Sequence, residues 1–195
     1  RDTAAAVALG AGLVNACHPT ASFCVLPADH VIGENHLFSA CLSQCFALAE
    51  EDEWLVPIGI RPTWPCTGYG YIEADDPLNS QGAARAFRVR RFVEKPDQTT
   101  AEEYVKAGTY YWNAGMFIWR TDVLHRAFDR FRPALSELMD RVSHCPIRGL
   151  PRRLAIWYEP LERISIDYAL MEKADRIAMV EALFPWDDVG DWPAL

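Results

Sequence analysis

The pattern of apolar and polar positions along residues 1–60 predicts a helix, a strand, a second helix and a second strand. Small apolar residues after Asp2 are typical of an N-capped helix that packs closely on its neighbours. Apolar residues recur at helical spacing over 35–49 and predict an amphipathic helix. The apolar runs 22–26 and 54–60 are typical of strands, and the first reads as a strand buried on both faces.

This alternation predicts the α/β class, with a mostly parallel mixed sheet flanked by helices. Pro57 inside the second strand favours an edge position or a bulge, because proline cannot donate to a neighbouring strand. Four further strands are expected in the segments around 71–75, 86–96, 110–120 and 177–183. Four further helices are expected, beginning at Thr99 or Thr100 and ending near Gly108, running from Thr121 to Arg130, following Pro133, and beginning at Ser165.

Length and composition narrow the class of protein. The chain has 195 residues, half of them hydrophobic, which is enough for one domain with a sizeable core. The 27 acidic residues outnumber the 19 Lys and Arg, giving a net charge of −8 that argues against a nucleic-acid partner. No apolar run approaches the roughly 20 residues of a membrane span. The six cysteines show no zinc-site spacing and predict reduced core thiols in a cytoplasmic protein.

Two acidic segments are candidates for a metal site. Asp29 follows the strand 22–26, at the end of a strand where open α/β sheets bind ligands, although an aspartate there is also an ordinary turn or cap residue. The segment 186–192 places three carboxylates, Asp187, Asp188 and Asp191, within five residues. The three carboxylates are equally consistent with a set of cation ligands and with an exposed acidic turn. His30 is interpreted as an orienting or packing residue.

A second group of residues suits a sugar phosphate. Lys95, one of three lysines, would present a compact positive charge to a phosphate at the sheet rim, and Glu94 would accept hydrogen bonds from sugar hydroxyls. The alternative is a surface ion pair of little energetic weight. Asn113 offers a donor and an acceptor to vicinal hydroxyls. Tyr69 and Gly70 supply a backbone open to close approach with an aromatic wall, or simply a turn.

In this order, the segments RDTAAAVALGA, VLPADHVI, PTWPCTGYGYI, RFVEKP, WNAGMF, SIDYALMEKA and WDDVGDW resemble successive blocks of the sugar-nucleotide pyrophosphorylases, in particular the bacterial mannose-1-phosphate guanylyltransferases. The resemblance runs from Arg1 to Leu195. It implies a Rossmann-like nucleotidyltransferase fold, incomplete at both ends, with 1–195 forming one catalytic domain. The family's glycine-rich phosphate loop would precede Arg1, and further residues would follow Leu195.

The same resemblance implies roles for individual residues. Asp29 and Asp188 match the two aspartates that bind Mg²⁺, and Lys95 matches the lysine on the sugar phosphate. Glu94 and Asn113 match residues on the mannose hydroxyls. The remaining matches are Tyr69 and Gly70 beside the sugar, and Arg1, Asp2 and Thr3 near the nucleotide base. Asp2, Ala5 and Cys66 depart from the family's usual Asn, Pro and Glu.

The implied reaction is transfer of GMP from GTP to mannose 1-phosphate, giving GDP-mannose and pyrophosphate. Without the glycine-rich loop, the residues 1–195 are expected to turn over little by themselves. The implied partners are GTP and mannose 1-phosphate, with neither nucleic acid nor membrane, and a homo-oligomer stays open. Two alternatives also stay open: a uridylyl- or thymidylyltransferase for glucose 1-phosphate, and a non-catalytic, regulatory nucleotide-sugar-binding member of the fold.

Overall fold

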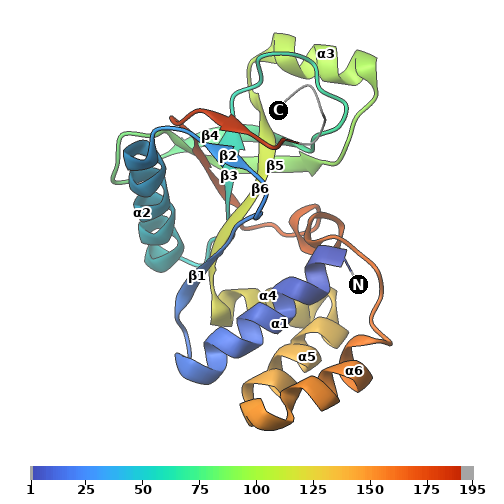
Figure 1. The fold of residues 1–195 in the computed structure, drawn as a ribbon. Coiled ribbons are helices and arrows are strands. Elements are labelled where there is room, and N and C mark those ends of the chain that lie inside the picture. Colours follow the sequence, from blue (N-terminus) through green and yellow to red (C-terminus); the bar gives the residue numbers. More distant parts are fainter. Residues whose placement is uncertain (1, 190–195) are drawn as a thin grey trace. The chain divides into compact units, whose positions relative to one another are not determined.

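The computed structural model describes residues 2–189, and the predicted helices and strands follow one another along them (Figure 1). The chain divides into two compact units, Arg1–Phe23 with Trp119–Asp175 and Cys24–Ile118 with Arg176–Leu195. Strands β1 (Ser22–Val25) and β6 (Tyr110–Arg120) each have residues in both units. The residues that the sequence nominates for the sugar phosphate and the metal all lie in the second unit.

The first unit is helical. Its elements are α1 (Asp2–Cys17), α4 (Thr121–Phe131), α5 (Pro133–Ser143), a 3₁₀ turn (Ile147–Gly149), α6 (Leu150–Tyr158) and a π-helical turn (Asp167–Met171). The predicted helices after Asp2, Thr121 and Pro133 are confirmed, although Thr121 makes no side-chain cap bond. Helix α1 approaches α5 so closely that a Cβ on Gly12 would lie 2.8 Å from Cβ of Val142.

The start of α1 is fastened to the segment before the π-helical turn. The backbone N–H of Ile166 donates to Thr3 Oγ1 over 2.8 Å, and the N–H of Ala4 donates to the carbonyl of Ile164. Ser165 Oγ accepts from the N–H of Tyr168, as a cap residue should. The helical element expected to begin at Ser165 is present, but as a π-helical turn, in which the N–H of Glu172 donates to the carbonyl of Asp167 five residues before it.

The second unit contains a mixed sheet in the order β1-β6-β3-β7-β5-β4, and β4 pairs additionally with β6. Its other strands are β3 (Val56–Ile60), β4 (Tyr71–Leu78), β5 (Ala86–Val93) and β7 (Ala178–Glu181). The pairings therefore form a closed circuit through β6, β3, β7, β5 and β4. Two-residue strands β2 (Val31–Ile32) and β8 (Trp186–Asp187) form a separate antiparallel pair, which the sequence did not predict.

The α/β class with a mixed sheet and flanking helices is confirmed, but parallel pairing is less common than expected. Within the described residues β3 and β7 are parallel, whereas β3–β6, β4–β5, β4–β6 and β5–β7 are antiparallel. The expectation extended the helix–strand alternation of residues 1–60 to the whole chain. Strands β4, β5 and β6 follow one another with α3 as the only intervening described helix, and they pair as antiparallel neighbours.

The structure corrects the expectations for two individual strands, β3 and β1. Strand β3 lies in the sheet interior, and Pro57 is accommodated by a shift of register against β6 between Pro57 and Gly59, so the bulge is confirmed and the edge position is not. Strand β1 is partly exposed along its whole length instead of buried on both faces, because it is the edge strand of the described sheet.

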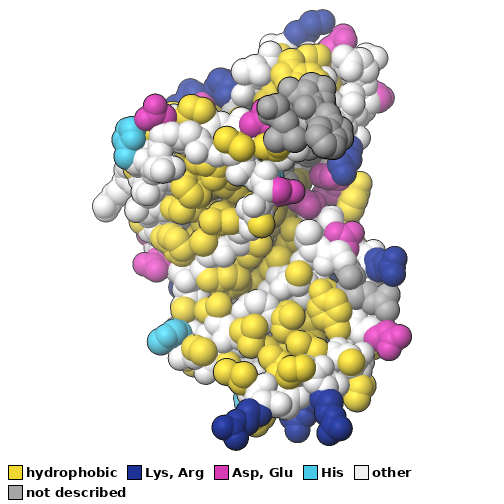
Figure 2. Space-filling model, in the orientation of Figure 1, with side chains coloured by type: hydrophobic (Ala, Val, Ile, Leu, Met, Phe, Trp, Pro, Cys, Tyr) yellow, Lys and Arg dark blue, Asp and Glu magenta, His cyan; other side chains and the backbone are white. Residues whose placement is uncertain are grey.

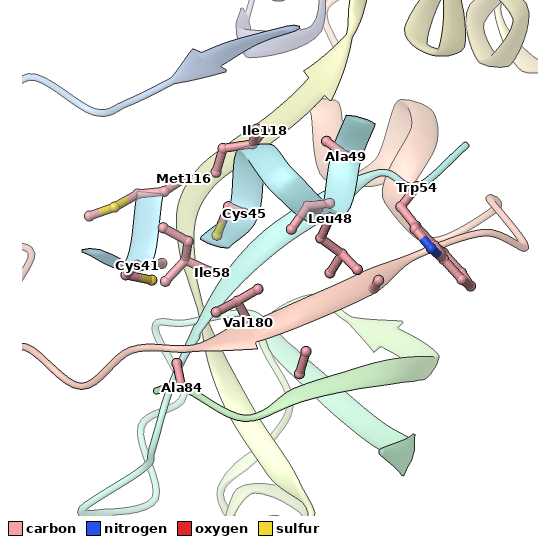
Figure 3. Close-up of a cluster of buried hydrophobic side chains, with 14 of the residues drawn as sticks. Cys41, Cys45, Leu48, Ala49, Trp54, Ile58, Ala84, Met116, Ile118 and Val180 are labelled. Carbon is pink, nitrogen blue, oxygen red and sulfur yellow. The ribbon is translucent and has the colours of Figure 1, made fainter. Parts of the chain in front are cut away.

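Helix α2 (Asn35–Glu51) covers one face of this sheet. Its buried side chains Cys41, Cys45, Leu48 and Ala49 pack against Ile58, Met116, Ile118 and Val180 from three strands (Figure 3). This burial explains why the apolar period of 35–49 predicted the helix. Helix α3 (Gln98–Ala107) packs Ala101 and Tyr104 on a second cluster with Tyr71, Tyr110 and Trp112.

The ends of α3 follow ordinary capping chemistry with one correction. Asp97, and not Thr99 or Thr100, is the N-cap, because its carboxylate accepts from the N–H of Thr100 over 2.8 Å. This bond lowers the pKa of Asp97. Gly108 ends the helix at φ 68°, as predicted.

The surface carries both charged and apolar side chains, and apolar side chains gather over α1 and α6 of the first unit (Figure 2). Ile156 of α6 is 72% exposed. Among residues 2–189, no helix is both long and apolar enough to span a membrane. All six cysteines are free thiols, of which Cys41, Cys45, Cys66 and Cys145 are buried.

The α1–α5 contact makes a testable prediction. Gly12→Ala should destabilise the protein by roughly 1–3 kcal/mol, because the new methyl meets Val142 and the Met139 carbonyl oxygen at 2.8 and 2.9 Å. Gly10→Ala in the same helix has nothing within 4 Å of the new methyl and should stabilise by up to about 1 kcal/mol. Urea unfolding of both variants measures the difference, and equal effects would contradict the packing described here.

Candidate functional site

The pairing of β2 with β8 brings the two acidic segments together. Val31 pairs with Asp187 and Ile32 with Trp186 in antiparallel register. Continued by one residue, this register places His30 opposite Asp188. Asp29, which precedes His30 and is exposed, therefore lies at the same end of the two-stranded sheet as Asp188. Segments separated by more than 150 residues in the sequence thus share one edge.

His30 lies near Asp29, Asp187 and Asp188. Its pKa is lowered, because the effect of burial outweighs the negative charges of these three carboxylates, which raise it. The indole N–H of Trp186 donates to His30 Nδ1 over 3.0 Å, and the two rings meet edge to face at 5.3 Å. Because Nδ1 accepts this bond, neutral His30 carries its proton on Nε2. The histidine therefore packs and orients the segment beside Asp29.

Asp187, the last residue of β8, and Asp188, which follows it, make different contacts. Asp187 Oδ1 accepts from the backbone N–H of Val189 over 2.7 Å, which is a local turn contact. Asp188 Oδ1 accepts instead from the hydroxyl of Tyr69 over 2.7 Å. Burial, and after it the bond to Asp188, raises the pKa of Tyr69 well above its ordinary value. The phenol is therefore protonated, and a donor, at neutral pH.

Three residues far apart in the sequence meet beside Tyr71. Tyr71 pairs with Val93 of β5 and with Trp112 of β6. One residue further along both registers, Gly70 lies opposite both Glu94 and Asn113. The N–H of Asn113 donates to the Gly70 carbonyl over 2.8 Å, and a Cβ on Gly70 would lie 2.6 Å from Glu94 Oε2. A glycine is needed at position 70 because these neighbours fill the space of a side chain.

The carboxamide of Asn113 is oriented by a bulge in β6. Between Pro57 and Gly59, the register of β3 against β6 shifts, and the additional β6 residues surround Gly115. Gly115 has φ 65°, a conformation that other residues rarely adopt. Its N–H donates to Asn113 Oδ1 over 3.0 Å. The oxygen of the amide is thereby directed along the strand.

Lys95 lies at the end of β5 in a strained backbone conformation. Its φ is 45°, in the left-handed region, although it is not glycine and Pro96 follows it. Its side chain is 61% exposed, and its Nζ is 3.4 Å from Oε1 of Glu94, which is 13% exposed. The strain and the pairing direct an accessible ammonium group to the side of a mostly buried carboxylate.

The residues expected near a nucleotide base belong to the first unit, and Arg1 lies outside the described residues. Asp2 has φ 68°, and its Oδ1 accepts from the N–H of Thr3 over 2.7 Å. The hydroxyl oxygen of Thr3 accepts from Ile166. Asp191, the third carboxylate of the last acidic segment, also lies outside the described residues. Within 2–189, no cluster of three or more His, Cys, Asp or Glu residues is arranged to hold a metal ion.

Sequence analysis missed two groups of interactions. One is the aromatic set around Tyr69, whose ring meets Trp112 and Trp186 edge to face at 5.2 and 5.5 Å. The other surrounds the buried carboxylate of Glu181, which accepts from Arg61 over 2.9 Å and from Arg85 over 2.7 Å. Nothing in the sequence marks Glu181, because its partners come from separate strand ends.

Comparison with known proteins assigns the family. The model of the nucleotidyl transferase family matches residues 1–195. The whole chain aligns at 38% identity with a mannose-1-phosphate guanylyltransferase of Sinorhizobium fredii and, also at 38%, with the xanthan biosynthesis protein XanB of Xanthomonas campestris. A crystal structure described as a mannose-1-phosphate geranyltransferase from Thermus thermophilus superposes with a TM-score of 0.86 at 39% identity, covering the whole chain and 54% of that protein.

The chain therefore belongs to the nucleotidyl transferase family. It spans 38% and 41% of the lengths of these two curated relatives. The name of the Sinorhizobium fredii relative agrees with the branch of the family that the motifs resemble.

The strain at Lys95 can be tested through stability. Lys95→Gly should be more stable than Lys95→Ala by roughly 0.5–1 kcal/mol, because glycine adopts φ 45° without the penalty that alanine keeps. Lys106 in α3 is the matched control, where alanine should be the more stable replacement by about 1 kcal/mol. The free energies come from urea unfolding. The same order at both positions would contradict the left-handed conformation of Lys95.

Proposed function

We propose that the protein transfers GMP from GTP to mannose 1-phosphate, giving GDP-mannose and pyrophosphate. The observation that carries this proposal is the strand register. The β2–β8 pair places Asp29 and Asp188 at one edge, and the double pairing of Tyr71 places Glu94 and Asn113 around Gly70. The names of relatives aligned over the whole chain support the choice of guanine and mannose. Since the family model covers both units, we treat 1–195 as one catalytic domain.

Asp29 and Asp188 are the proposed ligands of Mg²⁺. Mg²⁺ typically takes one or two protein carboxylates and fills its other positions with water and phosphate oxygens. Two aspartates at one edge of a two-stranded sheet, one of them exposed, fit this donor set. When bound there, the ion supplies charge neutralisation for the phosphates. Asp187 is not proposed as a ligand, because the motif resemblance matches Asp188 to the family's metal-binding aspartate; one oxygen of Asp187 accepts from the N–H of Val189 instead.

Lys95, Glu94 and Asn113 are the proposed residues for mannose 1-phosphate. The exposed ammonium of Lys95 offers a point charge to the phosphate. Glu94 accepts hydrogen bonds from mannose hydroxyls, and Lys95 nearby balances its charge. The bulge at Gly115 fixes the orientation of the Asn113 carboxamide. Tyr69 and Gly70 bound the sugar with their backbone, and Gly70 leaves room for the carboxylate of Glu94 beside it.

The proposed reaction is a single in-line displacement. A phosphate oxygen of mannose 1-phosphate attacks the α-phosphorus of GTP, and pyrophosphate leaves. Because the second pKa of a phosphate monoester is about 6, the nucleophile is already largely ionised at neutral pH and needs no general base. The side chains then contribute position and charge. The segment Arg1, Asp2 and Thr3 is proposed to lie near the base, on the strength of the family resemblance.

A pyrophosphate-release assay on the full-length protein tests the function. GTP with mannose 1-phosphate and Mg²⁺ should give release, and UTP or dTTP should give much less. Asp188→Asn should lower kcat at least about 100-fold, because a carboxylate ligand of the cation that neutralises the phosphates is lost. Asp187→Asn is the matched control and should retain activity, since an amide oxygen can still accept from Val189. Faster release with UTP or dTTP would overturn the choice of nucleotide.

Lys95→Ala tests the sugar-phosphate contact. The variant should have a higher KM for mannose 1-phosphate and a kcat about 100-fold lower, because the ammonium group that contacts the attacking phosphate is lost. KM for GTP should change little. Lys106→Ala, which removes an exposed lysine from the last turn of α3, should behave as wild type. Equal kinetics for the two variants would remove Lys95 from the site.

A further inference from the structure

The hydroxyl of Tyr69 makes a contact that the proposed binding roles leave unexplained. The function proposed above uses only the backbone of Tyr69, beside the sugar. Its side chain extends in another direction, where the hydroxyl donates to Asp188 Oδ1 over 2.7 Å. Tyr69 is 119 residues from Asp188 in the sequence, so the contact depends on the fold and not on a local turn.

The ring of Tyr69 is fixed by two tryptophans on different elements. Trp112 of β6 meets it at 5.2 Å with the ring planes 72° apart, and Trp186 of β8 meets it at 5.5 Å with the planes 66° apart. Edge-to-face contacts of this kind are favourable and directional. Trp186 is itself oriented by its bond to His30. The phenol is therefore held between β6, which carries Asn113, and β8, which directly precedes Asp188.

We propose that Tyr69 is a positioning residue that holds the carboxylate of Asp188 in the orientation in which it binds a divalent cation. This inference rests on the proposed function, in which Asp188 is a metal ligand. A carboxylate whose one oxygen accepts a fixed hydrogen bond loses less rotational freedom when it binds a cation, and partners of metal ligands commonly change metal affinity by 10- to 100-fold. Gly70 is the next residue, so one short segment bounds the sugar and orients the metal ligand.

Tyr69→Phe isolates this role, because it removes one hydroxyl and keeps the ring between the tryptophans. Tyr71→Phe is the matched control from the same segment. The hydroxyl of Tyr71 also makes a hydrogen bond, but it donates to the backbone carbonyl of Cys66 over 2.9 Å. Both variants lose one tyrosine hydroxyl bond, and only Tyr69→Phe loses the bond to Asp188.

The experiment measures binding of Mn²⁺ alone to the full-length protein by the electron paramagnetic resonance signal of the free ion. Four proteins are compared with the wild type: Tyr69→Phe, Tyr71→Phe, Asp188→Asn and the double variant Tyr69→Phe/Asp188→Asn. Tyr69→Phe should weaken Mn²⁺ binding about tenfold. Tyr71→Phe should leave it unchanged. In the Asp188→Asn background, Tyr69→Phe should cause no further loss, because Tyr69 acts through Asp188.

The outcomes separate this inference from the proposed function. If Asp188→Asn weakens Mn²⁺ binding while Tyr69→Phe matches Tyr71→Phe, the positioning role is refuted and the metal assignment stands. If Asp188→Asn has no effect on Mn²⁺ binding, the metal assignment and the positioning role both fall. A tenfold loss that persists in the double variant would also refute action through Asp188. Thermal unfolding of each variant shows whether a loss of affinity is merely a loss of fold.

Discussion

The site depends first on the double pairing of Tyr71. This residue starts β4 and pairs with Val93 of β5 on one side and with Trp112 of β6 on the other. Backbone hydrogen bonds of a sheet allow one register at each edge, so the positions of the residues just before Tyr71 and just after Val93 and Trp112 are determined together. The registers of both pairings therefore determine where the proposed sugar-binding residues Glu94 and Asn113 lie relative to Gly70.

The same constraint extends to the acidic residues through aromatic contacts. Tyr69 lies two residues before Tyr71 and packs between Trp112 of β6 and Trp186 of β8. Strand β8 pairs with β2 and so brings Asp188 to the same end of this strand pair as Asp29. A two-residue pair is weak by itself, and the ring contacts of Trp186 with His30 and Tyr69 support it. The positions of Asp29 and Asp188 at this edge therefore depend on the aromatic packing beside it.

Much of the fold was predictable because most elements are long and periodic. Helix α2 carries an apolar period that a helix buries on one face, and strand β6 consists largely of residues with high β-propensity. Apart from the expected parallel pairing, several errors come from short or local features. Strands β2 and β8 have two residues each and no period, and the π-helical turn after Ser165 has only five residues. The interior position of Pro57 depends on a bulge in its partner strand, which the sequence of β3 does not contain.

The candidate site was predictable in its residues and not in its contacts. Motif resemblance nominated Asp29, Asp188, Glu94 and Asn113, and strand register explains why Glu94 and Asn113 meet around Gly70. The bond from Tyr69 to Asp188 was not predictable, because no spacing rule relates residues 119 positions apart. The positive φ of Lys95 was equally hidden, since a lysine before proline gives no sign of a left-handed backbone.

The central claim is that the β2–β8 pair brings Asp29 and Asp188 to one divalent cation. The most direct measurement is anomalous diffraction from crystals of the full-length protein soaked in Mn²⁺. The account predicts one anomalous peak with a carboxylate oxygen of Asp29 and one of Asp188 both roughly 2 Å away. A peak bound by only one of them, or by neither, would contradict the account.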